Sequence, residues 1–327
     1  MRTFNWAILG PGHIARKFAA DLAHVPGARL HAVASRRRAT AEAFAAEFGA
    51  PHAVGSYAEL LAVPGIDAVY IATPHSEHHA HTLLCLRGGL PVLCEKAFAQ
   101  NTSQAQEMVR VAQEQGVFLM EAFWTRFFPA IAQALELVQA GTIGEVKHLV
   151  ADFGFAATFE PEGRLFSPAL AGGSLLDVGV YPLFISQLFL GRPAAVRAVA
   201  TPTGTGVDAN CAMALAYASG ATATLFSTIA APTDNRCVLY GTKGQLQLLG
   251  RFHAPTGVRV QLLGEEEARE YPAPTAGGGY HYEAAHVQQC LAQGLRESPL
   301  LPLAFSLELM ERLDAVRREI GLRYPGE

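Results

Sequence analysis

Three polar side chains, in two distant stretches of the chain, have types suited to moving a proton at a hydroxyl group. Asp177 and Tyr181 are four residues apart, so they share one face if this stretch is helical. Lys96 follows a short apolar run. A phenol beside a cationic amine has a lowered pKa and can take the proton of an alcohol during its oxidation. A helix N-terminal charge at Asp177 and a core aromatic ring at Tyr181 remain alternative readings.

The elements that position Lys96 belong to an alternation of short apolar runs and longer amphipathic ones over the first 120 residues. Such alternation is typical of βαβ units and a parallel sheet. The predicted strands are Asn5–Leu9, Leu30–Ala34, Ala68–Ala72, Pro91–Cys94 and Phe118–Glu121, and the predicted helices include Ala39–Phe48, Glu77–Arg87 and Ser103–Gln115. Lys96 then lies at the carboxyl end of a strand, the edge at which open α/β sheets bind ligands, where the face of Asp177 and Tyr181 can meet it.

After residue 122 the pattern changes to strand-like runs separated by turn residues. The sequence predicts a helix over 129–139, then strands over 146–155, 195–201, 211–217, 221–229, 236–240 and 258–263. Strands joined by short turns favour antiparallel pairing. We therefore expect a doubly wound Rossmann domain over 1–122 and an α+β domain over 123–327, built on a large, open, mainly antiparallel sheet. A final helix over about 303–320 can return to the first domain.

A glycine-rich turn lies between the first predicted strand and the first helix. It reads Gly10-Pro11-Gly12-His13-Ile14-Ala15, in which Gly10 makes the turn and Gly12 lets a phosphate approach the backbone. Ala15 replaces the third glycine where the helix packs on the sheet. A glycine turn alone is weak evidence, but its place after the first strand of a βαβ unit predicts a dinucleotide site at the helix N-terminus.

The end of the second predicted strand distinguishes between the two nicotinamide dinucleotides. An acid there would bind the ribose hydroxyl of NAD, but the chain reads Ser35-Arg36-Arg37-Arg38. Serine and guanidinium groups hold a 2′-phosphate by charge-assisted hydrogen bonds. The sequence therefore favours NADP, with Arg36 as the first choice among the three arginines, over a solvated basic start to the next helix.

Composition narrows the class of protein. The chain has 327 residues, of which 50% are hydrophobic and 17% charged, and a formal net charge of -4. Such a charge does not favour nucleic acid, and no run is read as a membrane span. The five cysteines show no CxxC spacing, which predicts reduced thiols and a cytoplasmic protein.

The sequence resembles the Gfo/Idh/MocA family of oxidoreductases along nearly its whole length, and within it the NADP-linked members that act on dihydrodiols and aldoses. The resemblance lies in Cys94-Glu95-Lys96, Met120–Pro129, Asp177–Tyr181, Gly241–Gly244 and Glu297–Pro299. It implies hydride transfer between a hydroxyl-bearing carbon and a nicotinamide, with an aldose or trans-dihydrodiol as substrate. It also implies a homodimer through the open sheet face of the second domain.

The resemblance assigns roles to individual residues. Lys96 and Tyr181 are implied to be catalytic, and Asp177 to bind or orient the substrate. Trp124 and Arg126 are implied to line the cleft, and Thr73, Pro74 and His78 to contact the nicotinamide half. The full expected cofactor-binding set is Gly10, Gly12, His13, Ile14, Ser35, Arg36, Thr73, Pro74, His75, His78, Glu95, Lys96, Trp124 and Arg126.

Two positions depart from common family patterns. Ala97 stands where relatives usually have proline, so we expect a trans Lys96–Ala97 peptide, because cis before a non-proline residue costs about 2.5–4 kcal/mol. Tyr181 stands where many relatives have histidine. The histidines at 75, 78, 79 and 81 lack a matching set of carboxylates or cysteines, so no metal site is expected. His281 is expected in a loop that either faces the substrate or lies at the surface.

Two other functions fit the same fold. A dinucleotide-binding sensor without turnover would have no use for Lys96, Asp177 and Tyr181 as a proton-transfer set. An NAD-dependent glycoside-cleaving enzyme would recycle its cofactor, and the basic stretch 35–38 argues against that reading. Fold alone does not separate these functions.

Overall fold

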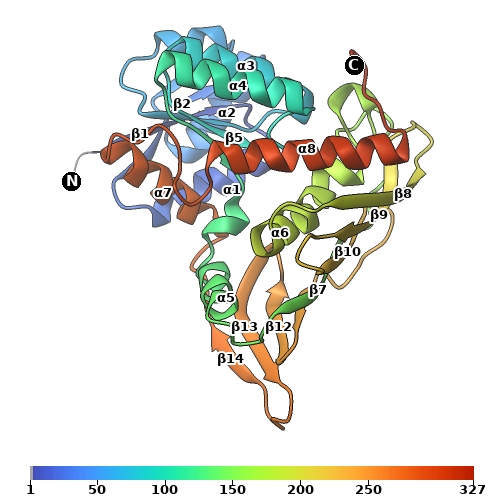
Figure 1. Cartoon of the computed structure of the whole chain (residues 1–327). Coiled ribbons are helices and arrows are strands. Elements are labelled where there is room, and N and C mark those ends of the chain that lie inside the picture. The colour runs from blue at the N-terminus through green and yellow to red at the C-terminus, as the bar shows by residue number, and fades with distance from the viewer. Residues whose placement is uncertain (1–2) are drawn as a thin grey trace. The chain divides into compact units, whose positions relative to one another are not determined.

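The computed structural model describes residues 3–327, so residues 1 and 2 of the predicted first domain lie outside the described residues. The chain forms two compact units. The first runs up to Trp124 and also takes in Ala276–Leu307, and the second comprises Thr125–Thr275 and Glu308–Glu327. Residues 276–307, which the sequence-based division placed in the second domain, therefore cluster with the first unit. Figure 1 labels many of the helices and strands of both units.

The first unit is built on a six-stranded sheet in the order β3-β2-β1-β4-β5-β6. Its strands are β1 (Phe4–Leu9), β2 (Ala28–Ala34), β3 (His52–Val54), β4 (Ala68–Ile71), β5 (Val92–Glu95) and β6 (Leu119–Ala122). Every neighbouring pair is parallel. The strand order reverses beside β1, which is where doubly wound sheets bind their ligands. The predicted Rossmann architecture is confirmed, although β3, only three residues long, is missing from the predicted strands.

Local sequence signals mark the ends of one helix of this unit, Thr102–Gln115, most clearly. The helices are α1 (His13–Asp21), α2 (Arg38–Phe48), α3 (His75–Arg87), α4 (Thr102–Gln115) and α7 (Tyr280–Ala292), with short helices η1 (Leu22–His24) and η2 (Ala58–Ala62). At α4, the Asn101 side chain accepts a hydrogen bond from Gln104 N, and Gly116 ends the helix at φ 64°, which costs glycine little. Phe18 of α1 stacks on Tyr70 of β4 with ring centroids 3.9 Å apart, so helix and sheet share one core.

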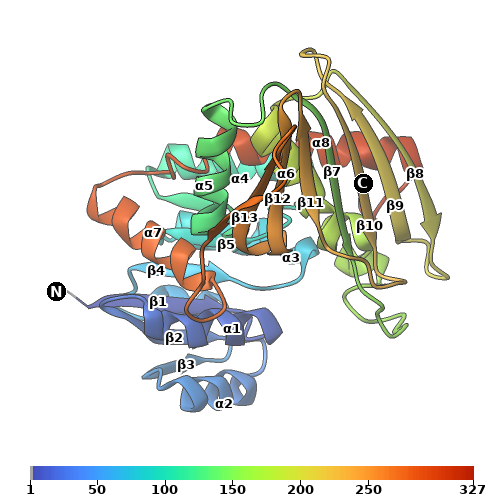
Figure 2. The same ribbon diagram turned by 90° about the horizontal axis from the view of Figure 1, so that it is seen from below.

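The second unit contains an eight-stranded sheet in the order β14-β13-β12-β11-β7-β10-β9-β8, seen as a continuous surface from β13 to β8 in Figure 2. Its strands are β7 (Val146–Gly154), β8 (Ala195–Pro202), β9 (Asp208–Ala216), β10 (Thr222–Thr228), β11 (Cys237–Gly241), β12 (Gly244–Arg251), β13 (Ala254–Leu262) and β14 (Arg269–Pro272). Only β7 and β10 pair in parallel, so the predicted mainly antiparallel sheet is confirmed. The strands β12 and β14 are additions, since glycine, glutamine and charged residues weaken their strand pattern.

One face of this sheet is buried and the other is exposed. Along β9, Cys211, Met213 and Leu215 are buried, whereas Ala212 and Ala214 between them are exposed. This alternation is the pattern of a sheet covered on one side only. The covered face packs against α5 (Pro129–Gln139), the wide-turn helix η5 (Leu175–Gly179) and α6 (Val180–Leu190).

The remaining helices are η3 (Trp124–Phe127), η4 (Pro168–Leu170) and α8 (Leu303–Ile320). The bounds of α8 match the predicted final helix.

One helical stretch among the described residues, Pro168–Leu190, is long and apolar enough to cross a membrane, with a mean hydropathy of 1.4. The statement that no run is read as a span is therefore corrected for this stretch. Because 89% of its apolar window is buried inside the structure, its side chains serve the core of the second unit.

Candidate functional site

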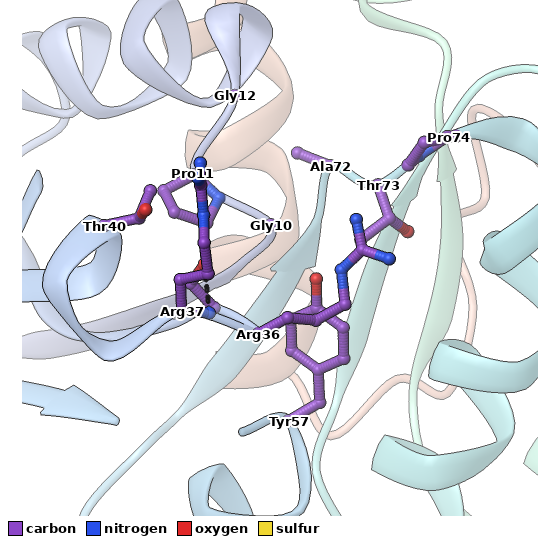
Figure 3. A pocket seen from close by; sticks show the side chains of 11 residues that line it. Gly10, Pro11, Gly12, Arg36, Arg37, Thr40, Tyr57, Ala72, Thr73 and Pro74 are labelled. Atoms are coloured by element: carbon purple, nitrogen blue, oxygen red, sulfur yellow. Dashed lines mark hydrogen bonds between the residues drawn. The ribbon is translucent and has the colours of Figure 1, made fainter. Parts of the chain in front are cut away.

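A pocket of about 370 Å³ lies at the carboxyl ends of β1, β2 and β4 in the first unit (Figure 3). Its lining residues are Gly10, Pro11, Gly12, Ser35, Arg36, Arg37, Thr40, Tyr57, Ala72, Thr73 and Pro74. The pocket therefore combines the glycine turn, the end of the second strand and the loop after the fourth. This is the edge at which open parallel sheets bind dinucleotides.

The two glycines of the turn have different physical reasons to be there. Gly10 has φ +91°, and a Cβ on it would lie 2.7 Å from Thr73 Cγ2, so a side chain would be strained and would clash. A Cβ on Gly12 would meet nothing within 4 Å, which leaves the backbone before α1 open to a ligand. The first N–H groups of a helix lack partners within it and favour anions. The turn therefore fits the pyrophosphate of a nicotinamide dinucleotide.

The three arginines after β2 separate into two groups. Arg36 and Arg37 line the pocket, and the Arg36 guanidinium extends past Tyr57 toward Thr73 (Figure 3). The Arg38 guanidinium instead forms an ion pair with Glu59 at 2.8 Å and donates to the Ala53 carbonyl oxygen at 3.3 Å. Two of the three cationic groups are thus available to a phosphate in the pocket.

The sequence singled out six of the lining residues in advance: Gly10, Gly12, Ser35, Arg36, Thr73 and Pro74. His13 and Ile14 open α1 next to the turn but are not among the lining residues. Thr40 and Tyr57 were not predicted. Tyr57 lies in the loop after β3, a strand too short to be predicted, so no pattern placed this ring near the glycine turn.

His78 bridges the loops that follow β4 and β5. The ring is fully buried, and its Nδ1 and Nε2 lie 2.8 Å from the carbonyl oxygens of Ala97 and Thr73, respectively. Burial lowers the pKa of His78 to about 4, so the ring is neutral at pH 7. A neutral imidazole has a single N–H, so the ring donates to one of these two carbonyl oxygens and only packs against the other. His78 thus lies between the residue after Lys96 and the pocket-lining loop at Thr73, and His75 packs edge-on against its ring at 5.6 Å.

The Lys96–Ala97 peptide is cis, and the expectation of a trans peptide was wrong. That expectation weighed only the local cost of the dipeptide. The structure shows that Ala97 and Phe98 are fully buried and that the Ala97 carbonyl oxygen lies within hydrogen-bonding distance of His78. This peptide is therefore enclosed by the fold and contacts a side chain that is distant from it in sequence.

Buried carboxyl groups surround the end of β5. Glu95 is buried and accepts a hydrogen bond from the Tyr70 hydroxyl. Burial raises the pKa of Glu121 to about 7. The pKa of Glu283 on α7 is raised well above its usual value by burial, and further by the negative charges of Glu95 and Asp21. Near neutral pH the interior around this strand end therefore holds part of its carboxyl groups in the protonated form.

Helix α7 places an aromatic ring against Trp124. The Tyr280 ring stacks on Trp124 with centroids 4.4 Å apart and planes at 9°. The Asp21 carboxylate caps the helix, accepting hydrogen bonds from Gly278 N and Tyr280 N at 2.8 Å each. His281 therefore lies in a helix, and its expected place in a loop was wrong. The capping carboxylate is 259 residues away in sequence, so no local pattern marks this helix start.

In the second unit, Asp177 and Tyr181 lie on one helical segment, as their spacing predicts. Asp177 belongs to η5 and Tyr181 to the first turn of α6, and both side chains are buried. Asp177 Oδ1 accepts from Arg164 Nη1 at 2.6 Å. The wide turn of η5 is a form found often at functional sites.

Two rings surround the Tyr181 side chain. Phe153 of β7 lies 5.2 Å from the Tyr181 ring, and His253 lies 5.5 Å from it. Phe153 and His253 stack face to face at 4.1 Å, and Thr125 Oγ1 donates to the His253 carbonyl oxygen at 2.7 Å. Tyr181 is therefore held by packing on both rings. Arg126, also expected to line the cleft, is half-buried in η3.

The histidines of α3 have protein partners. His79 Nε2 lies 2.8 Å from Glu107, and His81 Nδ1 lies 3.1 Å from Thr73 Oγ1. Among residues 3–327, no group of three or more His, Cys, Asp or Glu side chains is arranged to hold a metal ion.

Comparison with known proteins places this site in a family. Residues 4–123 match the Gfo/Idh/MocA oxidoreductase family model with an NAD-binding Rossmann fold, and residues 131–247 match the family's C-terminal domain. The chain belongs to this family. It is 40% identical to a trans-1,2-dihydrobenzene-1,2-diol dehydrogenase of Mus musculus and 39% identical to that of Bos taurus, covering 98% of each partner in both comparisons. The expected family and its dihydrodiol branch are confirmed, and the chain is an oxidoreductase of the NAD(P)-dependent type.

Solved structures agree with this placement. An aldose-aldose oxidoreductase from Caulobacter crescentus, solved with glycerol, matches with a TM-score of 0.89 at 28% identity over 97% of both chains. A 3-ketoreductase from Actinomadura kijaniata, solved with NADP and TDP-benzene, matches with a TM-score of 0.86 at 28% identity over 98% of both chains. The structural relatives of this chain therefore include one named for aldoses and one crystallised with NADP.

Proposed function

We propose that this protein is an NADP-dependent dehydrogenase that oxidises a hydroxyl-bearing carbon of a trans-dihydrodiol or an aldose. The observation that carries the cofactor proposal is the joint lining of one pocket by Gly12, Ser35, Arg36 and Arg37. The open backbone at Gly12 suits the pyrophosphate, and two guanidinium groups suit a 2′-phosphate. NADP would supply the acceptor for the hydride that leaves the substrate carbon.

The chemistry of the protein's own residues follows from their types. Lys96 supplies an ammonium group that polarises the substrate hydroxyl and favours the phenolate form of Tyr181, which takes the hydroxyl proton. Asp177 accepts a hydrogen bond from the substrate and orients it. His78 and the Phe153–His253 pair hold Lys96 and Tyr181, respectively, in place, which is how fixed geometry contributes to rate. Thr73, Pro74 and His75 start the loop and helix beside the pocket, and Glu95 precedes Lys96.

The substrate class rests on relatives. The curated relatives are named for a dihydrobenzenediol, and one structural relative for aldoses. Both compounds carry neighbouring hydroxyl groups, so a carboxylate beside a proton acceptor suits either. D-xylose and trans-1,2-dihydrobenzene-1,2-diol are therefore the first two compounds to compare.

The test is the initial rate of nicotinamide reduction with NADP and, separately, with NAD, over a panel of aldoses and vicinal diols. Turnover with NADP well above NAD supports the proposal and names the substrate class. Tight NADP binding without turnover on any compound would favour the sensor reading. Release of a glycoside's leaving group without net reduction would favour glycoside cleavage.

The proposal extends to a cytoplasmic homodimer. The exposed face of the second sheet carries small side chains, including Ala212, Ala214 and Ala216 on β9, which let a second copy approach closely. Light scattering should then give twice the 34.9 kDa chain mass. An Ala214→Arg variant should shift the measured mass toward that of one chain. If the unmodified protein itself has the mass of one chain, the dimer is ruled out.

A further inference from the structure

The segment that carries Asp177 and Tyr181 lies against two buried polar side chains on β9 and β10. Gly173 has φ +110°, and a Cβ on it would lie 2.2 Å from Asp208 Oδ1. A Cβ on Gly179 would lie 2.8 Å from Ser227 Oγ. Both glycines therefore permit a close approach that a larger residue would prevent. The approach brings the start of the helix onto Asp208.

The Asp208 carboxylate binds this helix start directly. Its Oδ2 accepts hydrogen bonds from Ser174 Oγ and from Leu175 N, each at 2.7 Å. Ser174 Oγ lies 3.0 Å from Ser227 Oγ and, having donated its own proton to Asp208, accepts there. All three side chains are buried, with Asp208 3% exposed and both serines fully enclosed. The carboxylate therefore caps a helix 33 residues away in sequence, in place of a local capping residue.

The cap is close in sequence to both proposed active-site residues. Leu175 is two residues before Asp177, and the helix continues without interruption to Tyr181. On the other side of the segment, the Tyr324 hydroxyl donates to the Gly172 carbonyl oxygen at 2.6 Å. The position and rotation of the helix therefore depend on contacts made just before it begins.

We propose that Asp208 is a positioning residue, whose buried carboxylate sets the placement of helix 174–181 and thereby the geometry of Asp177 and Tyr181. This inference rests on the proposed roles of Asp177 and Tyr181. It adds a group on β9 that acts through Ser174 and Leu175. Misplacement of a reacting group by about 1 Å can cost about 100-fold in rate.

Protonation of Asp208 gives the proposal a measurable signature. Burial raises the pKa of Asp208 to about 6, against the lowering effect of hydrogen bonds from the Ser174 hydroxyl and from backbone groups of Leu175, Asp208 and Ser174. The other titratable groups facing it are Tyr324, whose pKa is raised well above its usual value, and Cys211, whose pKa is raised to about 12. Neither changes charge between pH 5 and 8. Activity should therefore fall as the pH drops through about 6, when the carboxylate becomes protonated and loses acceptor capacity.

The test compares Asp208→Asn, Asp208→Ala and, as a matched control on an exposed loop, Asp234→Asn. Asparagine keeps an oxygen that can accept from Ser174 and Leu175 but cannot titrate. We expect Asp208→Asn to keep most of kcat at pH 8 and to lose the acidic limb near pH 6. We expect Asp208→Ala to lose kcat by about 10- to 100-fold, with the Kd for NADP unchanged, and Asp234→Asn to match the unmodified protein.

Two further results make the outcome decisive. An acidic limb that persists in Asp208→Asn, or an Asp208→Ala variant with normal kcat, would overturn the positioning role even when the unmodified enzyme turns over. If the unmodified protein shows no turnover, the proposed function fails separately. Amide hydrogen exchange over 174–181 then decides, because Asp208→Ala should speed exchange there and leave the glycine turn at 10–12 unchanged. Unchanged exchange over 174–181 would overturn the inference.

Discussion

Replacement of Arg36 by alanine should weaken NADP binding far more than NAD binding. Arg36 lines the cofactor pocket, and its side chain is exposed to an incoming ligand. A hydrogen bond to a charged group contributes about 1.5–3 kcal/mol, which corresponds to about 10- to 150-fold in Kd. Because the side chain is exposed and screened by salt, we expect the lower part of this range, about 10- to 30-fold.

The matched control is Arg38→Ala, which removes the same charge two residues away. The Arg38 guanidinium is paired with Glu59 outside the pocket lining, so only its long-range field reaches a phosphate. We expect the Kd for NADP to rise by less than about 3-fold in Arg38→Ala, and this small increase should vanish at high ionic strength. For Arg36→Ala, the loss of NADP affinity should persist at high ionic strength because a direct contact is removed.

The assay is titration calorimetry with NADP and NAD at low and high ionic strength, with thermal unfolding as a check on each variant. Equal losses for Arg36→Ala and Arg38→Ala would show that net charge alone attracts the cofactor. An equal loss of NAD and NADP affinity in Arg36→Ala would show that Arg36 acts on a group common to both dinucleotides. Either result would refute the assignment of Arg36 to the 2′-phosphate.

Three other substitutions test separate parts of the structure. Gly10→Ala should lower the melting temperature as well as cofactor affinity, because the added Cβ meets Thr73, whereas Gly12→Ala should lower affinity alone; equal melting losses in calorimetry would contradict this. Tyr181→Phe should reduce kcat by about 100-fold or more with an unchanged Kd for NADP, and near-normal kcat in stopped-flow assays would exclude Tyr181 as proton acceptor. Burial raises the pKa of Glu121 to about 7. Its contribution to the free energy of unfolding is therefore most favourable below about pH 4.5 and is lost as the pH rises through 7. Between pH 4.5 and 7, the unmodified protein should lose up to about 3 kcal/mol of unfolding free energy that Glu121→Gln does not lose. Urea unfolding across this pH range measures the difference, and an unchanged pH dependence in the variant would show that Glu121 titrates normally.

The sequence predicts the parts of this protein that depend on neighbouring residues. The glycine turn, the arginines after β2 and the bounds of α5 and α8 all follow from patterns within one or two turns of chain. Helix α7 could not be predicted, because its cap is Asp21, and neither could the cis peptide at Ala97, which distant side chains enclose.

The same limit applies to the candidate site. The spacing of Asp177 and Tyr181 predicts a shared helical face, but the wide turn of η5 depends on contacts with β9 and β10 that no local pattern contains. Tyr57 was missed for a related reason, since three-residue strands such as β3 carry too little periodicity to be recognised. Residues that act through distant partners are therefore the ones that sequence patterns leave out.

The return of residues 276–307 to the first unit has a consequence for synthesis on the ribosome. The first unit needs Gly278 and Tyr280 to satisfy Asp21, and Leu119 N of the edge strand β6 donates to the Arg296 carbonyl oxygen at 3.1 Å. When the chain has emerged only as far as Trp124, these partners do not yet exist. In the nascent Rossmann sheet, the Asp21 carboxylate and the edge of β6 therefore stay without these partners. They can be paired only after about 150 further residues have been translated.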